Sequence, residues 1–139
     1  MMYEREVEVP RLVASVRIGD ADIPELRDTA ALVEHLAGAR FNSIGLNLYR
    51  DRRDSVAPHN DTLGEIAAGQ PVALLSLGAA RRMTIRSKAL PRRVLDMDLE
   101  PGSVLIMSYR TQQTYDHGIP KTGAAVGPRI SAAFRARLG

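Results

Sequence analysis

Short β-type segments separated by turn signals make up most of this chain, and their regular spacing limits the folds that the chain can adopt. Six such segments lie at residues 42–49, 71–77, 82–87, 93–99, 103–107 and 129–135. Glycine and proline punctuate them, as in the Pro101–Gly102 and Gly127–Pro128 pairs. Many short strands in close succession are typical of a sandwich or barrel, so we predict a mainly β (α+β) protein. The apolar run VALLSL at residues 72–77 has no polar face, which predicts a central strand.

The first part of the chain follows a different pattern. Residues 5–18 alternate charged and apolar side chains, which predicts a strand or hairpin interrupted at Pro10. Residues 22–38 are rich in helix-forming residues and end at Gly38, which predicts a single N-terminal helix.

Length and composition exclude several classes of protein. The 139 residues are enough for one domain, and the chain has no cysteine, which excludes disulfides and thiolate metal sites. Any metal ligands are therefore expected among histidines and carboxylates. The N-terminus lacks an apolar signal region, and no apolar run approaches the ~18 residues of a membrane span. We predict a cytoplasmic protein with no membrane contact.

The charge balance leaves the question of a nucleic-acid partner open. Nineteen basic residues against 16 acidic ones give a net charge of +3, but arginines cluster at residues 50–53, 81–86 and 92–93. Such clusters suit phosphate or carboxylate groups, and they equally fit a solvated basic surface.

Two of the predicted strands carry a polar face. In an extended strand, residues two apart point to the same side. The polar faces comprise Asn47 and Tyr49 in the segment 42–49, and Arg129, Ser131 and Arg135 in the segment 129–135. Taken alone, each pattern fits a half-exposed surface strand better than a functional site.

His59 and Asp61 are also two residues apart, and an extended backbone would direct both side chains to one point. With a further histidine they form the facial triad of two histidines and one carboxylate that holds Fe(II). His117 follows His59 by 58 residues, whereas His35 lies on the predicted helix. A lone H-x-D pair arises often by chance. The joint order N-x-Y, H-x-D, H and R-x5-R is far more specific.

At these residues the chain resembles the AlkB-type Fe(II)/2-oxoglutarate-dependent dioxygenases. The similarity runs over residues 41–137, through FNSIGLNLYRD, PHND, PVALLSLGAARRMTIR, EPGSVLIMSYRTQQTYDHGIPK and GPRISAAFR. It implies a double-stranded β-helix, or jelly-roll, core at residues 41–139 within a single domain. Residues 1–40 would form the remnant of an N-terminal lid and a supporting helix.

The resemblance also implies a role for each residue of the site. His59, Asp61 and His117 would ligate Fe(II), and no catalytic residue beyond these ligands is expected. Arg129 would pair with the distal carboxylate of 2-oxoglutarate. The rest of the cosubstrate site would comprise Asn47, Tyr49, Ser131 and Arg135. Substrate contacts are expected from Tyr3, Arg11 and Tyr115.

The implied reaction consumes 2-oxoglutarate and O₂ and hydroxylates a substrate C–H bond. On an N-methyl group, the hydroxylated product decomposes to formaldehyde and the bare base, so the expected substrate is alkylated DNA or RNA. Thr62 and Leu63 follow Asp61 where many relatives carry acidic residues, and few aromatic side chains are present to stack on a base.

The alternatives are an oxygenase of the same fold that acts on a small molecule or a protein side chain, and a catalytically silent nucleic-acid-binding module. The silent module is disfavoured because every expected metal and cosubstrate position is filled. We infer no obligate protein partner.

Overall fold

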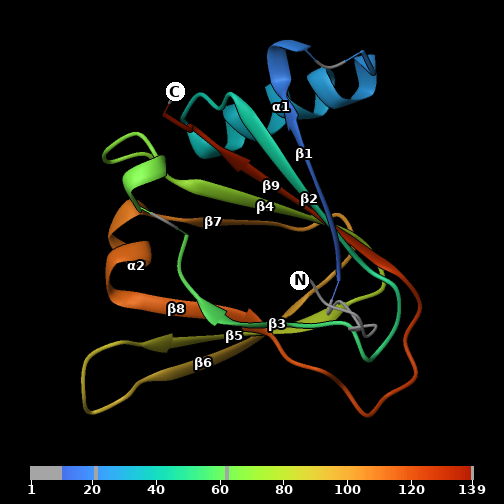
Figure 1. Ribbon diagram of the computed structural model, residues 1–139, viewed down its shortest axis with the longest axis vertical. Coiled ribbons are helices and arrows are strands. Elements are labelled where there is room, and N and C mark those ends of the chain that lie inside the picture. Colours follow the sequence, from blue (N-terminus) through green and yellow to red (C-terminus); the bar gives the residue numbers. More distant parts are fainter. Residues whose placement is uncertain (1–10, 21, 62, 139) are drawn as a thin grey trace, which may run out of the picture.

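Two antiparallel β-sheets face each other in the computed structural model, which describes residues 11–20, 22–61 and 63–138 (Figure 1). The first sheet contains, in spatial order, β1 (Leu12–Arg17), β2 (Ser43–Tyr49), β9 (Arg129–Arg135), β4 (Val72–Gly78) and β7 (Val104–Met107). The second contains β3 (Val56–His59), β8 (Tyr115–Ile119), β5 (Arg81–Ser87) and β6 (Val94–Leu99). The chain crosses repeatedly between the sheets, as expected for the predicted jelly-roll.

All six strands predicted from the β-type segments and turn signals are confirmed to within one or two residues. The run VALLSL forms most of β4, which lies in the interior of its sheet between β9 and β7. The structure adds β3, β8 and the short helix α2 (Tyr109–Thr114), which the sequence did not predict.

The sequence pattern does not identify β3, because this strand has only four residues and contains Pro58. Its pairing with β8 is also irregular between Val56 and His59. Gly118 on β8 permits this close crossing, because a Cβ atom there would lie 2.8 Å from the Val56 carbonyl oxygen.

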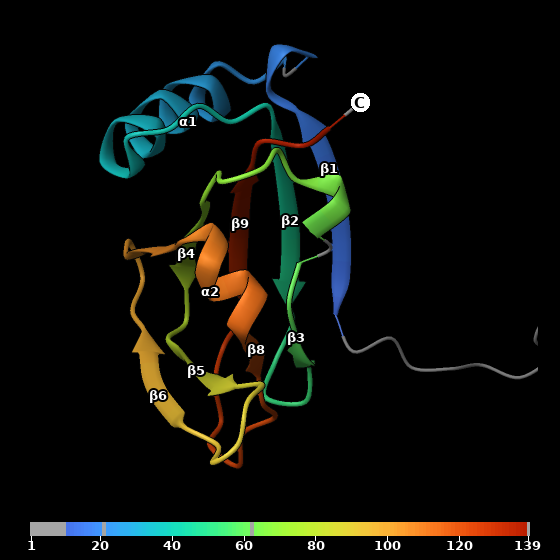
Figure 2. The ribbon, with the colours of Figure 1, turned by 90° about the vertical axis from the view of Figure 1, so that its left-hand side faces the viewer.

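The N-terminal elements pack directly onto the first sheet. β1 pairs with β2 along its whole length, and a 3₁₀ turn (Ile18–Asp20) follows it. The predicted helix is confirmed as α1 (Pro24–Ala37), which starts with proline and ends at Gly38 in the left-handed conformation (φ 64°). It covers the ends of β2 and β9 through contacts with Phe41, Ile44 and Phe134 (Figure 2). The division of the chain at residue 40 stays a prediction.

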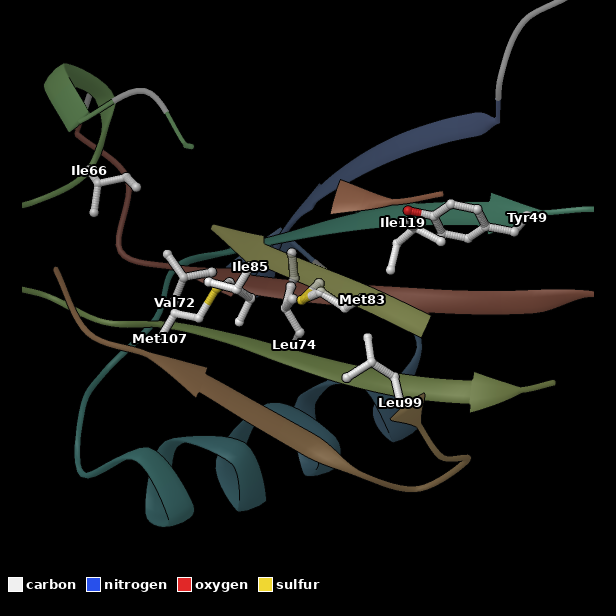
Figure 3. Close-up of a cluster of buried hydrophobic side chains, with 10 residues drawn as sticks. Tyr49, Ile66, Val72, Leu74, Met83, Ile85, Leu99, Met107 and Ile119 are labelled. Carbon is white, nitrogen blue, oxygen red and sulfur yellow. The ribbon is translucent and has the colours of Figure 1, made fainter. Parts of the chain in front are cut away.

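Apolar side chains fill part of the space between the sheets. Figure 3 shows this core, which includes Val72, Leu74, Met83, Ile85 and Ile119. The polar faces of β2 and β9 lie beyond it and look toward β3 and β8, so the fold encloses a cavity at this point. No helix among the described residues is long and apolar enough to cross a membrane.

Candidate functional site

Three ligand-type side chains meet where β3 and β8 pair. His59 lies directly opposite His117 in the register, and their ring centroids are 4.5 Å apart. Asp61 follows two residues after His59, and one ligand atom from each of the three side chains lies within 4.8 Å of the others. Two imidazoles and one carboxylate fit a six-coordinate Fe(II) that keeps open positions for further ligands. The structure thus brings together the three predicted metal ligands.

Both histidines are prepared for metal binding. His59 Nδ1 lies 2.9 Å from the Ala57 carbonyl oxygen, which can only accept, so Nδ1 carries a proton and Nε2 is the nitrogen available to a metal. Burial and, to a smaller extent, the charge of the neighbouring His59 lower the pKa of His117 to about 4. His117 is therefore neutral at pH 7, the form that binds a metal.

Asp61 is buried, and hydrogen bonds hold both its carboxylate and its backbone N–H. Its Oδ2 accepts from Arg135 Nε at 2.7 Å, and its backbone N–H donates to Gln112 Oε1 at 2.9 Å. Its Oδ1 lies 3.9 Å from His59 Nε2. The carboxylate is thus oriented with one oxygen toward the histidines, while the guanidinium compensates the charge of the other.

Arg135 reaches Asp61 by lying across β2. A Cβ atom on Gly45 would come within 2.7 Å of Arg135 Nη1. The glycine therefore gives the guanidinium room to pass from β9 over β2 toward the metal ligands. Arg135 was predicted to bind cosubstrate, and the structure places it both against Asp61 and in the wall of the cavity.

A cavity of about 350 Å³ adjoins the histidines and contains the other predicted cosubstrate residues. Arg129 is only 1% exposed and donates from Nη2 to Ser76 Oγ at 2.9 Å. Its Nε and Nη1 make no hydrogen bond of good geometry among the described residues, although the Tyr49 hydroxyl interacts with the guanidinium. Buried donors are almost always paired, so two unpaired guanidinium donors in a cavity wall fit a bound carboxylate.

Tyr49 shapes the same part of the cavity. Its ring lies 5.1 Å from the Arg129 guanidinium and 5.6 Å from that of Arg81. Burial raises the pKa of the Tyr49 phenol, so the group stays a neutral hydrogen-bond donor. Asn47 and Ser131 are paired in the strand register, and both line the cavity.

The polar faces of β2 and β9 therefore point inward, and the surface-strand interpretation of these segments is wrong. The opposite faces are the apolar ones, and they pack under α1 through Ile44, Ala132 and Phe134.

The predicted substrate residues have three different outcomes. Arg11 lines the cavity, and its Nε donates to Asn47 Oδ1 at 2.9 Å. Tyr3 lies outside the described residues. Tyr115 is not among the residues that line the cavity: it packs against the apolar core and borders a groove with Leu95 and Leu105. A strand advances ~3.3 Å per residue, so Tyr115 is displaced along β8 from His117, toward α2.

Two of the arginine clusters have structural uses that their composition did not reveal. Arg81 is buried and donates to the carbonyl oxygens of Asp51, Asp54 and Pro120. Arg50 binds the Asp54 carboxylate at 2.8 Å. These arginines stabilise the loop between β2 and β3, which leads into the strand that ends at His59.

Three further residues of the site were not predicted from sequence. Ser76 interrupts an apolar run, and that interruption is a signal that could have identified it. Gly45 stands on the inward face of its strand, where a missing side chain leaves room for a neighbour. Gln112 gives no local signal, because its role depends on a partner 51 residues away.

Comparisons with known proteins agree with this geometry. The family model described as the 2OG-Fe(II) oxygenase superfamily matches residues 13–138. "DNA oxidative demethylase ALKBH2" from Bos taurus is 32% identical over 120 residues, covering 81% of this chain and 43% of that protein. "Alpha-ketoglutarate-dependent dioxygenase alkB homolog 3" from Homo sapiens is 34% identical over 120 residues, covering 81% of this chain and 42% of that protein.

A solved structure shares the fold. "The structure of OsALKBH1" superposes with a TM-score of 0.59 at 19% sequence identity, covering 82% of this chain and 64% of that one. Together, the comparisons match most of this chain, whereas the chain spans less than half the length of the curated relatives above.

Proposed function

Because the chain belongs to the 2OG-Fe(II) oxygenase superfamily, we propose that it is an Fe(II)- and 2-oxoglutarate-dependent dioxygenase that demethylates alkylated bases of DNA or RNA. One observation carries the dioxygenase part of the proposal. A cluster of two histidines and one carboxylate adjoins the same cavity as a buried guanidinium with two unpaired donors. The first group suits the metal, and the second suits the dicarboxylate cosubstrate.

In this proposal the chain's own residues bind and orient the reactants. His59 Nε2, Asp61 Oδ1 and an imidazole nitrogen of His117 would hold the metal. Fe(II), 2-oxoglutarate and O₂ together supply the oxidising chemistry, which yields succinate and CO₂ and hydroxylates the substrate. The fixed positive charge of Arg129 holds the distal carboxylate of 2-oxoglutarate, and Tyr49 donates from its neutral phenol.

Other residues of the cavity keep the metal ligands and the cosubstrate groups in position. Asn47 and Ser131 present polar groups along the cosubstrate, and Arg11 restrains the Asn47 amide. Leu74 and Met83 line the cavity from the apolar core and limit the access of water. Arg135 orients the Asp61 carboxylate through its hydrogen bond to Oδ2.

The substrate class rests on the relatives and on charge. The two relatives described above are named as a DNA oxidative demethylase and an alkB homologue. Arg11 in the cavity wall and Arg137, which lines the cavity and a smaller hollow beside Asp61, place positive charge near the metal ligands. Arginine at such a position suits a backbone phosphate. Hydroxylation of an N-methyl group then releases formaldehyde and restores the base.

Succinate and formaldehyde formation test the proposal. We expect Fe(II)-dependent turnover of 2-oxoglutarate that rises with oligonucleotides containing 1-methyladenine or 3-methylcytosine, while unmodified oligonucleotides have no effect. His59→Ala should abolish succinate formation. Turnover that no methylated oligonucleotide stimulates would instead favour an oxygenase of a small molecule or protein side chain. Turnover that survives in His59→Ala would refute the metal assignment. The cytoplasmic location and the absence of an obligate protein partner stay predictions.

A further inference from the structure

Gln112 is a buried amide that the proposed reaction does not yet use. It is the buried residue of the short helix α2, with only 1% of its surface exposed. Its Oε1 accepts the backbone N–H of Asp61 at 2.9 Å, and its Nε2 has no hydrogen-bond partner among the described residues. A half-satisfied buried amide opposes folding, so an apolar side chain of similar size would suit this position better if packing were its only role.

The hydrogen bond acts where the sheet no longer holds the chain. β3 ends at His59, the last residue of that strand in register with β8. Asp61 lies two residues beyond this pair, and among the described residues no ladder bond fixes it. Gln112 supplies the missing backbone contact from outside the sheet.

The residue between the two ligands is tied to the same helix. Lys88 Nζ donates to Asn60 Oδ1 at 2.8 Å and lies 3.4 Å from the Gln112 carbonyl oxygen. Asn60 Nδ2 in turn donates to the Asp61 carbonyl oxygen at 2.7 Å. Asn60 and Asp61 are therefore both tied to α2, Asp61 directly and Asn60 through Lys88 in the loop after β5.

The helix is itself well anchored. Ser108 caps it by accepting the Thr111 N–H at 3.1 Å, and the Lys88 N–H donates to the Thr114 carbonyl oxygen at 2.9 Å. Tyr109 and Tyr115 pack against the apolar core at its two ends.

α2 runs directly into β8, where His117 follows Gln112 by only five residues (Figure 1). One continuous, anchored segment thus carries one metal ligand and binds the backbone of another.

We propose that Gln112 is a positioning residue that fixes the Asp61 carboxylate relative to His117 and so sets the affinity of the metal centre. This inference rests on the proposed function of His59, Asp61 and His117 as metal ligands. Partners that orient metal ligands typically change metal affinity by about 10- to 100-fold when they are removed. Gln112 acts through Asp61 and does not itself touch the metal or the substrate.

Mn(II) binding to the full chain, followed by electron paramagnetic resonance, tests the inference without any turnover. Gln112→Met keeps the length of the side chain and removes the acceptor, whereas Gln112→Glu keeps an acceptor oxygen. Gln113→Met is the matched control, because Gln113 is the exposed neighbour on the same helix. Thermal unfolding of each metal-free variant reports the fold separately.

We expect Gln112→Met to weaken Mn(II) binding at least tenfold. Its metal-free form should unfold close to the wild-type temperature, because removal of the unpaired Nε2 offsets the loss of the partner of the Asp61 N–H. Gln113→Met and Gln112→Glu should bind Mn(II) within a few fold of the wild type. Wild-type affinity in Gln112→Met would overturn the inference. A loss of Mn(II) affinity in Gln112→Glu as large as the loss in Gln112→Met would also overturn it. If Gln112→Met does not fold, a loss of more than a few fold in Gln112→Glu would overturn it as well. Failure of the wild type itself to bind Mn(II), or unchanged binding in His59→Ala, would instead refute the proposed metal centre.

Discussion

Replacing Arg129 by methionine should separate the stability of the empty protein from its affinity for a dicarboxylate. Methionine fills a similar volume without charge, and Arg129 is buried with two donors, Nε and Nη1, that make no hydrogen bond of good geometry among the described residues. An unpaired buried donor costs about 1–3 kcal/mol, so the substitution relieves about 2–6 kcal/mol of penalty. It also removes the bond to Ser76 and the contact with the Tyr49 ring, which contribute about 1 kcal/mol each.

We therefore expect the free energy of unfolding of Arg129→Met, without ligands, to be equal to or above that of the wild type. Hydrogen bonds to charged groups contribute about 1.5–3 kcal/mol each, so the loss of two such bonds to a carboxylate amounts to about 3–6 kcal/mol. Since 1.4 kcal/mol is a factor of ten, 2-oxoglutarate binding should weaken at least about 100-fold.

Urea unfolding of the ligand-free protein and calorimetric titration with N-oxalylglycine in the presence of Mn(II) measure the two quantities. Arg129→Lys is the control for charge alone, because it keeps the cation without the planar pair of donors. Unchanged N-oxalylglycine affinity in Arg129→Met would refute the assignment of this residue. A loss of unfolding free energy of about 3 kcal/mol or more in the ligand-free variant would show that the donors are paired inside the protein.

Two further perturbations test the supports of the site. Gly45→Ala places a methyl group 2.7 Å from Arg135 Nη1, so the guanidinium must move and Mn(II) affinity should fall several-fold. Gly123→Ala is the control, because nothing lies within 4 Å of a Cβ atom at that position. Equal Mn(II) affinities in the two variants would contradict this reasoning. The Asp54 carboxylate accepts hydrogen bonds from Arg50, which hold its pKa below the ordinary value of 3.8. The pair therefore stabilises the fold above about pH 4, and this contribution is lost as the pH falls below that value. In urea unfolding at several pH values, Asp54→Asn should lose less stability than the wild type below pH 4, and parallel pH profiles would argue against the pair.

Alternation, apolar runs and turn signals were sufficient to predict six strands and the helix α1. The longest of these strands, β2, β4, β5 and β9, have seven residues each and several buried side chains. β3 has four residues, contains Pro58 and pairs irregularly with β8, and α2 has only six residues, so neither shows a clear pattern in the sequence. They are stabilised by tertiary contacts, such as the crossing of β3 over Gly118.

The direction of the polar faces was likewise decided by tertiary structure. Alternation shows that Arg129 and Ile130 lie on opposite sides of β9, but not which side faces the second sheet. The family resemblance supplied that choice, and the 1% exposure of Arg129 against 41% for Ile130 confirms it. Local sequence could not have predicted the contacts of Asp61 with Gln112 and Arg135, because they join residues 51 and 74 positions apart.

A crystal structure of the protein with Mn(II) and N-oxalylglycine tests the central claim most directly. Our account predicts one Mn(II) bound by His59, Asp61 and His117, and the distal carboxylate of N-oxalylglycine on the Nε and Nη1 donors of Arg129. Mn(II) bound elsewhere, or a carboxylate that leaves those two donors unpaired, would contradict it.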